Sequence, residues 1–359
     1  MLIIVVTLIL MVRIGGDLME IREREIMLGN LEETDLKDGE YLKAPEFRGI
    51  EAWINSEPLT MDSLRGKVVL IDFWTYSCIH CIRTLPYLKA WHGKYSDNGL
   101  VLIGVHTPEF FFEEGYDNVK NAVEKYGLNY PVALDNDGVV WRSFSNRYWP
   151  TKYIIDGDGY IRFVHLGEGG YEEAEDVIRD LLVEGGHDLP QEDVADPSEA
   201  VDVPFWRIGT PEIYFGYAFV GNRNKLGNPE GFDPEGIVDY RRPKKVDGNL
   251  VYLHGRWLNR PDHMEYVGEE KDGRIILRYS ARAVNIVAGS GSRGEIKISL
   301  DGEPLTERNE GRDAISGGES RAVIGDNGLY NIVFDEGYGE HTLELEVERG
   351  FKIYTFTFG

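Results

Sequence analysis

Two cysteines three residues apart constrain this chain more than any other feature. Cys78 and Cys81 are the only cysteines among 359 residues, and they follow an apolar run at residues 68–71 that ends in Asp72. A strand that leads into the first turn of a helix brings both sulfur atoms to one place, where they can form a disulfide with little strain. The positive end of the helix favours a thiolate there. The spacing therefore predicts dithiol and disulfide chemistry.

The charge and cysteine content exclude several classes of protein. Aspartate and glutamate total 62 against 38 lysines and arginines, which gives a formal net charge of -24. Such an acidic surface repels phosphate backbones, so nucleic acid is excluded as a partner. No cysteine remains for a structural disulfide framework, and a structural zinc site needs about four thiolate or imidazole ligands. Two weaker interpretations stay open: a metal site that recruits distant histidines, and two buried structural cysteines.

Residues 1–40 predict a signal or anchor followed by a polar tether. The run at residues 2–12 is aliphatic apart from Thr7. It is shorter than the ~20 residues that span a bilayer, but it fits the apolar part of an export signal. We interpret it as an export signal, an anchor or the end of a longer membrane domain. A buried strand or helix is the alternative.

Residues 41–186 predict an α/β domain with a central mixed sheet covered by helices on both faces. Helical spacing of apolar residues follows the cysteines, with Pro86 kinking that helix, and recurs at 116–126 and 171–183. Asp137 is expected to cap a helical turn through residue 144. Strands are expected at 51–54, 67–73, 100–106, 130–134, 151–156 and 160–166, the last two forming a hairpin.

The remainder predicts a linker and an all-β domain. Residues 187–204 are acidic and proline-containing with few apolar positions, as in a linker. Beyond them, residues 205–359 lose helical periodicity, and short alternating segments between Gly, Asn and Asp turns predict an antiparallel β-sandwich. The clearest such segments are 274–279, 295–300, 330–334, 342–347 and 351–358.

The motif itself assigns chemical roles. Cys78, at the helix start, is expected to be the exposed nucleophile, and Cys81, one turn inside, the shielded resolving thiol. A protonated His80 would favour the Cys78 thiolate, while the alternative is a surface side chain with a modest effect. Burial of Asp72 at the end of its strand would raise its pKa and suit it to exchange protons with Cys81; otherwise it only ends the strand.

These residues carry a family resemblance. Asp72-Phe73-Trp74, the two cysteines and Pro86 resemble the active site of the thioredoxin superfamily, and the pattern over residues 66–81 is similar to its TlpA-like branch. Together with residues 104–109 and 354–359, the pattern resembles the soluble C-terminal region of DipZ-type proteins. DipZ-type chains usually carry an N-terminal multi-helix membrane domain, whereas this chain has only a short apolar segment.

The resemblance implies further site residues and a ligand-binding module. It implies that Pro150 is a cis-proline that faces the cysteines, that Trp149 offers its backbone to an extended substrate, and that Trp74 and His80 line the substrate site. For residues 205–359 it implies a jelly roll like a carbohydrate-binding module. Aromatic residues there could form a platform for a sugar or peptide, or could belong to the core: Trp206, Tyr214, Tyr217, Tyr252 and Trp257.

The functional hypothesis is an extracytoplasmic thiol-disulfide oxidoreductase that reduces protein disulfides. It needs no cofactor beyond the Cys78–Cys81 disulfide, and the resemblance implies a membrane electron donor of the CcdA/DsbD kind. The alternative is a cell-surface glycan-binding or protein-binding module with an auxiliary thioredoxin-like domain. A peroxidase is disfavoured because the peroxidatic Pro-x-x-x-Thr/Ser-x-x-Cys pattern is absent. The dipeptide Ile79-His80 differs from the Gly-Pro of thioredoxins, which leaves the direction of electron flow open.

Overall fold

The structure is a computed structural model that describes residues 36–37, 41–189, 207–219, 223–269, 272–291 and 293–359, with the single positions 197, 200 and 203. The predicted signal or anchor and most of the predicted linker lie outside the described residues. The chain divides into two compact units. The first comprises Met1–Thr75, Thr84–Thr107 and Lys120–Glu199, and the second Tyr76–Arg83, Pro108–Val119 and Ala200–Gly359. The domain boundaries at 41–186 and 205–359 stay predictions.

The first unit is built on a mixed six-stranded sheet. Its order is β3 (Ala52–Ile54), β6 (Val132–Leu134), β5 (Leu100–His106), β4 (Val68–Trp74), β7 (Thr151–Ile155) and β8 (Ile161–Leu166). The pairs β4–β5 and β5–β6 are parallel and the others antiparallel, as the predicted alternation of strands and helices requires. A two-residue β1 (Leu36–Lys37) pairs separately with β2 (Tyr41–Leu42).

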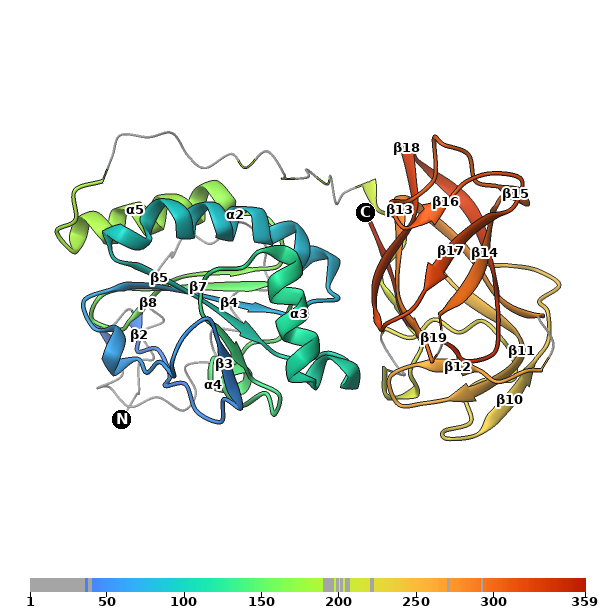
Figure 1. Cartoon of the computed structure of the whole chain (residues 1–359), viewed down its shortest axis with the longest axis horizontal. Coiled ribbons are helices and arrows are strands. Elements are labelled where there is room, and N and C mark those ends of the chain that lie inside the picture. Colours follow the sequence, from blue (N-terminus) through green and yellow to red (C-terminus); the bar gives the residue numbers. More distant parts are fainter. Residues whose placement is uncertain are drawn as a thin grey trace, which may run out of the picture. The chain divides into compact units, whose positions relative to one another are not determined.

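Strand β4 is buried along its whole length, because helices cover both faces of the sheet. In Figure 1, α2 (Ile79–Tyr95) and α5 (Tyr171–Glu184) lie side by side on one face, and α4 (Val139–Ser143) lies on the other. The face toward α4 holds Phe73, Val140 and Phe144 in one apolar cluster. Since side chains alternate along a strand, Asp72 points toward the opposite face.

The helices agree with the expected spacing, with one correction. The predicted helix over 116–126 is α3 (Tyr116–Tyr126), and Pro86 lies inside α2. Asp137 does not cap α4: the preceding residue is Gly138 in a left-handed conformation, with no side-chain cap. Asp135 supplies the acceptor instead, at 2.9 Å from the Val140 amide, because the chain turns sharply at Gly138. Short 3-10 turns cover Asp62–Leu64, Ser96–Asn98, Phe111–Glu114 and Tyr217–Phe219.

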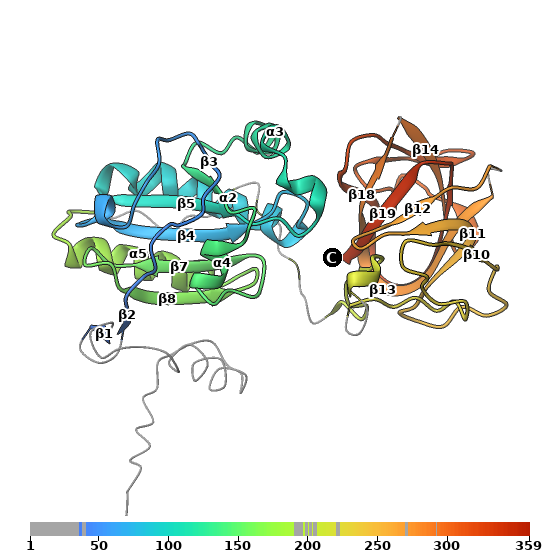
Figure 2. The same ribbon diagram turned by 90° about the horizontal axis from the view of Figure 1, so that it is seen from below.

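The β-rich region forms one antiparallel sheet that closes on itself (Figure 2). The long strand β13 (Gly273–Ser290) pairs with β11 through its first part and with β19 through its last, while β18 (Gly328–Val347) runs along nearly all of it. The other strands are β9 (Ile213–Tyr214), β10 (Ile237–Tyr240), β11 (Val251–Asn259), β12 (Met264–Tyr266), β14 (Gly294–Leu300), β15 (Glu303–Pro304), β16 (Ala314–Ile315), β17 (Ser320–Ile324) and β19 (Phe351–Phe358).

One sequence prediction for this region is wrong in detail, and one open alternative is decided for the residues that the structure describes. Segments 330–334 and 342–347 are parts of the single strand β18, which continues through a bulge: Ala281 pairs with Gly339 and Ala283 with Phe334. The aromatic residues considered as a platform belong largely to the interior. Tyr214, Tyr252 and Trp257 are buried, Tyr217 is half-buried, and Trp206 lies outside the described residues.

Candidate active site

The two cysteines lie at the N-terminus of α2, where the first backbone amides have no acceptor within the helix. Cys78 immediately precedes the helix and is partly exposed, whereas Cys81 in the first turn is fully buried. The Cys81 amide donates to the Cys78 sulfur at 3.2 Å. An N–H aimed at this sulfur stabilises a thiolate on Cys78. The nucleophilic role of Cys78 and the resolving role of Cys81 were predicted on this same difference in exposure.

His80 is held on both ring nitrogens. Its Nδ1 lies 3.0 Å from the Arg83 guanidinium, one turn along α2. Its Nε2 lies 3.5 Å from the carboxylate of Glu212, which belongs to the same compact unit. The imidazole is therefore a fixed part of the motif's surroundings and not a free surface side chain.

Asp72 is a buried acid on β4. It is 1% exposed, and among the described residues neither of its carboxylate oxygens has a hydrogen-bond partner. Burial raises its pKa from 3.8 to about 7, against the opposing effect of Lys152. The sequence predicted this direction from the position of the acid at the end of an apolar strand.

Lys152 lies directly across from Asp72 in the pairing of β4 with β7. Its side chain is fully buried, its Nζ donates to the Gly167 carbonyl at 3.2 Å, and it lies 5.3 Å from the centre of the Tyr171 ring. Buried lysines are rare unless paired, so this one marks the interior beside Asp72 as a polar site inside an apolar layer.

The Trp149–Pro150 peptide bond is cis, as the resemblance implied, and Pro150 is buried immediately before β7. The Trp149 indole donates to the Thr107 carbonyl at 3.0 Å and packs against Trp141. Trp74 is fully buried, with its ring edge against His106. Full burial argues against a direct contact of Trp74 with substrate, and its ring packs within the first unit.

Comparison with known proteins places this geometry in a family. Family models match residues 42–164, as the AhpC/TSA family, and residues 210–359, as the thioredoxin like C-terminal domain. Protein DipZ of Mycobacterium bovis is 36% identical over 326 residues, which is 88% of this chain and 43% of DipZ. The thiol-disulfide oxidoreductase YkuV of Bacillus subtilis is 30% identical over 141 residues, 39% of this chain and 94% of YkuV. The chain belongs to the thioredoxin-like thiol-disulfide oxidoreductases.

The match to DipZ covers only part of that protein, since the chain spans 43% of its length. Among solved structures, the crystal structure of a thioredoxin-like superfamily protein is 27% identical and covers 41% of this chain and 99% of its own, with a TM-score of 0.38. None of the helices in the described parts of the chain combines the length and apolar character that a bilayer crossing requires.

This thioredoxin-like oxidoreductase carries buried acids that sequence reasoning missed. Glu113 is fully buried and accepts hydrogen bonds from the Ser77 hydroxyl at 2.5 Å and from the Glu109 amide at 2.7 Å, so it anchors the loop before the cysteines. Burial, together with Glu212 and Glu113, raises the pKa of Glu109 to about 8. The signal for these acids was present in a loop where three phenylalanines stand between glutamates at residues 109–114, a composition that is unusual for exposed chain.

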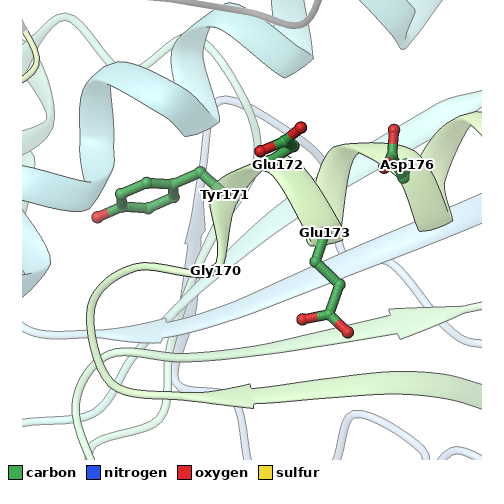
Figure 3. Close-up of a pocket in the computed structure, with 5 residues that line it drawn as sticks. All are labelled: Gly170, Tyr171, Glu172, Glu173 and Asp176. Atoms are coloured by element: carbon green, nitrogen blue, oxygen red, sulfur yellow. The ribbon is translucent and has the colours of Figure 1, made fainter. Parts of the chain in front are cut away.

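A metal site and a surface hollow are two further candidates among the described residues. The described residues contain no group of three or more His, Cys, Asp or Glu side chains placed to hold a metal ion. A hollow at the start of α5 is lined by Gly170, Tyr171, Glu172, Glu173 and Asp176 (Figure 3). None of the predicted site residues lines it, and a cluster of solvated acids at a helix start is ordinary surface chemistry.

Proposed function

We propose that this protein reduces disulfide bonds in other proteins, with Cys78 as the nucleophile and Cys81 as the resolving thiol. The observation that carries the proposal is the arrangement at the start of α2: a partly exposed sulfur that accepts an amide hydrogen bond, and a buried sulfur one turn inside. Exchange requires one accessible thiolate and one protected thiol that can follow it.

The proposed cycle begins when the Cys78 thiolate attacks a substrate disulfide. A bond forms between Cys78 and one substrate sulfur, and the other substrate sulfur leaves as a thiolate. Cys81 then loses its proton and attacks Cys78, which forms the Cys78–Cys81 disulfide and releases the second substrate thiol. The enzyme pair loses two electrons and the substrate gains them.

We assign the proton from Cys81 to Asp72. Asp72 is buried, and its pKa of about 7 lets it both accept and return a proton near neutral pH. Pro150, with the backbone of Trp149, is proposed to bind an extended substrate segment.

Insulin reduction tests this function. The wild type, supplied with dithiothreitol, is expected to precipitate insulin faster than dithiothreitol alone. Cys78→Ser is expected to leave only the background rate. Equal rates for the two proteins would reject the enzyme hypothesis and favour the alternative of a binding protein.

The surroundings of the reaction are also proposals. The similarity to DipZ and the apolar run at residues 2–12 favour an extracytoplasmic, membrane-anchored protein that is re-reduced by a membrane electron donor of the CcdA/DsbD kind. Equilibration of the cysteine pair with glutathione tests the direction of electron flow. A potential well below that of glutathione supports a reductase, and a high potential supports an oxidase.

A second candidate function is glycan or protein binding by the β-rich region, as a jelly roll like a carbohydrate-binding module. One observation favours it: Phe334 is 44% exposed, and the Arg282 guanidinium lies over its ring at 4.6 Å. An exposed aromatic face beside a cation suits a sugar or an acidic peptide. Loss of binding in Phe334→Ala, measured by calorimetry with a glycan panel, would support it, and no binding by the wild type would reject it.

A further inference from the structure

One phenylalanine of the loop at residues 109–114 stands on the surface. Phe111 is 64% exposed, whereas its neighbours Phe110 and Phe112 pack inward against the apolar cluster that contains Tyr354. The rings of Phe110 and Phe112 are stacked, with their centroids 5.7 Å apart. The loop is therefore anchored on both sides of Phe111, whose own side chain is presented outward.

Hydrogen bonds hold the backbone at and around this side chain. The Phe111 amide donates to the buried carboxylate of Asp262 at 3.2 Å. The Glu113 carboxylate accepts from the amides of Glu109 and Phe110, at 2.7 and 3.0 Å. Since the backbone is already restrained, little conformational freedom is lost when a partner binds the exposed ring, and most of the contact energy is available for binding.

The same loop is joined to the residues that directly precede Cys78. The Ser77 hydroxyl donates to the Glu113 carboxylate at 2.5 Å. The Tyr76 hydroxyl donates to the Phe112 carbonyl at 3.3 Å. All of these residues belong to one compact unit. The loop and the nucleophilic cysteine are therefore parts of one surface of this unit.

A polypeptide bonded to Cys78 can reach Phe111. The hydrogen-bonded route through Ser77 limits the distance between the Cα atoms of Cys78 and Phe111 to about 21 Å, which an extended chain covers in about six residues. The mixed disulfide holds the substrate chain at Cys78, so the residues next to the substrate cysteine lie within this range. The substrate is therefore the occupant that the position of Phe111 favours.

The surface beside Phe111 is acidic. The turn Phe111–Glu114 is a 3-10 helix, in which side chains three residues apart lie over one another, and Glu114 is exposed. Asp117, in the first turn of α3, is exposed as well. An aromatic ring next to carboxylates favours a segment with apolar and basic side chains and disfavours an acidic segment.

We propose that Phe111 and Glu114 form a substrate-binding element: Phe111 contacts an apolar side chain near the substrate cysteine, and Glu114 favours a basic residue beside it. The substrate class is a disulfide in an unfolded or extended polypeptide, because folded proteins bury most of their apolar side chains. The inference rests on the proposed function and deepens it, since it states which protein disulfides the enzyme prefers.

The test is an exchange that transfers no net electrons. In the Cys81→Ser background, the mixed disulfide of Cys78 with glutathione is combined with a peptide that carries one cysteine. The protein–glutathione disulfide breaks, a protein–peptide disulfide forms, and glutathione leaves as the thiol with the proton that the peptide thiol loses. Two peptides are compared, with leucine or with serine at the positions around the cysteine. Mass spectrometry gives the equilibrium constant for each.

The protein with its natural loop is expected to favour the leucine peptide. Phe111→Ala is expected to lower the ratio of the two equilibrium constants about fivefold, and Phe111→Leu, which keeps an apolar side chain, should retain most of it. The control is Ile237→Ala, which shortens a 50% exposed side chain on β10 of the same unit and should keep the full ratio. Equal ratios in Phe111→Ala and Ile237→Ala, or a ratio near one with the natural loop, would overturn the proposal.

The charge is tested with a second pair of peptides, in which lysine or glutamate accompanies the leucines. The lysine peptide is expected to be preferred at low salt, and Glu114→Gln should reduce this preference about twofold. The same preference in Glu114→Gln would overturn the role of Glu114.

These outcomes separate the inference from the proposed function, because the exchange does not require net reduction of a substrate. If the wild type reduces insulin but Phe111→Ala matches Ile237→Ala, the role of Phe111 is wrong and the enzyme function stands. If the ratio falls as expected but the wild type does not reduce insulin, the proposed function is wrong and Phe111 still binds peptides. Circular dichroism of the variants checks that each is folded.

Discussion

Replacing Asp72 with asparagine removes an ionisable group from the interior and should change how stability depends on pH. Asp72 has a pKa of 3.8 in the unfolded chain and about 7 in the folded protein, chiefly because burial penalises the carboxylate. Between these values the folded state holds a proton that the unfolded state has released. The free energy of unfolding therefore falls as pH rises from about 4 to about 7.

The size of this effect follows from the difference between the two pKa values. One pKa unit corresponds to 1.36 kcal/mol, so a rise from 3.8 to about 7 amounts to about 4 kcal/mol, as an order of magnitude. The stabilisation is complete below the unfolded pKa and is lost by about pH 8. Asp72→Asn has no carboxylate at this position, so its stability should not fall for this reason as pH rises. Burial of the amide changes its stability by an amount that does not depend on pH.

The assay is urea unfolding of the wild type and Asp72→Asn at several pH values from 4 to 8. The difference between their unfolding free energies is expected to grow by up to about 4 kcal/mol in favour of the variant over this window. Asp97→Asn, at an exposed aspartate, serves as the control and should follow the wild type. A difference that stays constant from pH 4 to 8 would refute the account of Asp72.

Further predictions concern buried charges and packing. Lys152→Met removes the cation that opposes the effect of burial on Asp72, so the variant should go on losing stability to a higher pH than the wild type does. The same dependence of unfolding free energy on pH in both proteins would show that the lysine has no influence. The wild type should lose stability as pH rises from 4.5 through about 8, because burial raises the pKa of Glu109, and Glu109→Gln should not show this loss. Urea unfolding of both proteins across this range tests the prediction, and an equal dependence of their unfolding free energies on pH would contradict it. Phe110→Ala should cost about 3 to 4 kcal/mol because its ring is 2% exposed, whereas Phe111→Ala, at 64% exposed, should cost under about 0.5 kcal/mol; similar costs in thermal unfolding would contradict the packing.

The elements that were predictable from the sequence are those whose signal is local. The continuous apolar run before the cysteines predicts a buried strand, and the spacing after it predicts a helix. Together these predicted β4, the start of α2 and the burial of Asp72. The thioredoxin-like family was likewise identified from residues that are near one another in the chain.

The parts that sequence reasoning missed depend on pairing between distant segments. Lys152 looks like an ordinary strand lysine until the register of β7 against β4 places it opposite Asp72. Glu212 lies 3.5 Å from His80, a contact between positions far apart in the chain, and it directly precedes β9, which pairs with β19. The single strand β18 was divided in two because its bulge contains glycines and acids that resemble a turn. Register and tertiary packing are non-local, so one sequence does not reveal them.

Trapping of mixed disulfides tests the central claim most directly. Reduced Cys81→Ser, incubated with insulin or another protein disulfide, is expected to accumulate a covalent complex, because the resolving sulfur is absent. Mass spectrometry should locate its linkage at Cys78. Cys78→Ser treated in the same way should form none. A complex that forms with Cys78→Ser and not with Cys81→Ser would contradict the account, because it would make the buried Cys81 the nucleophile.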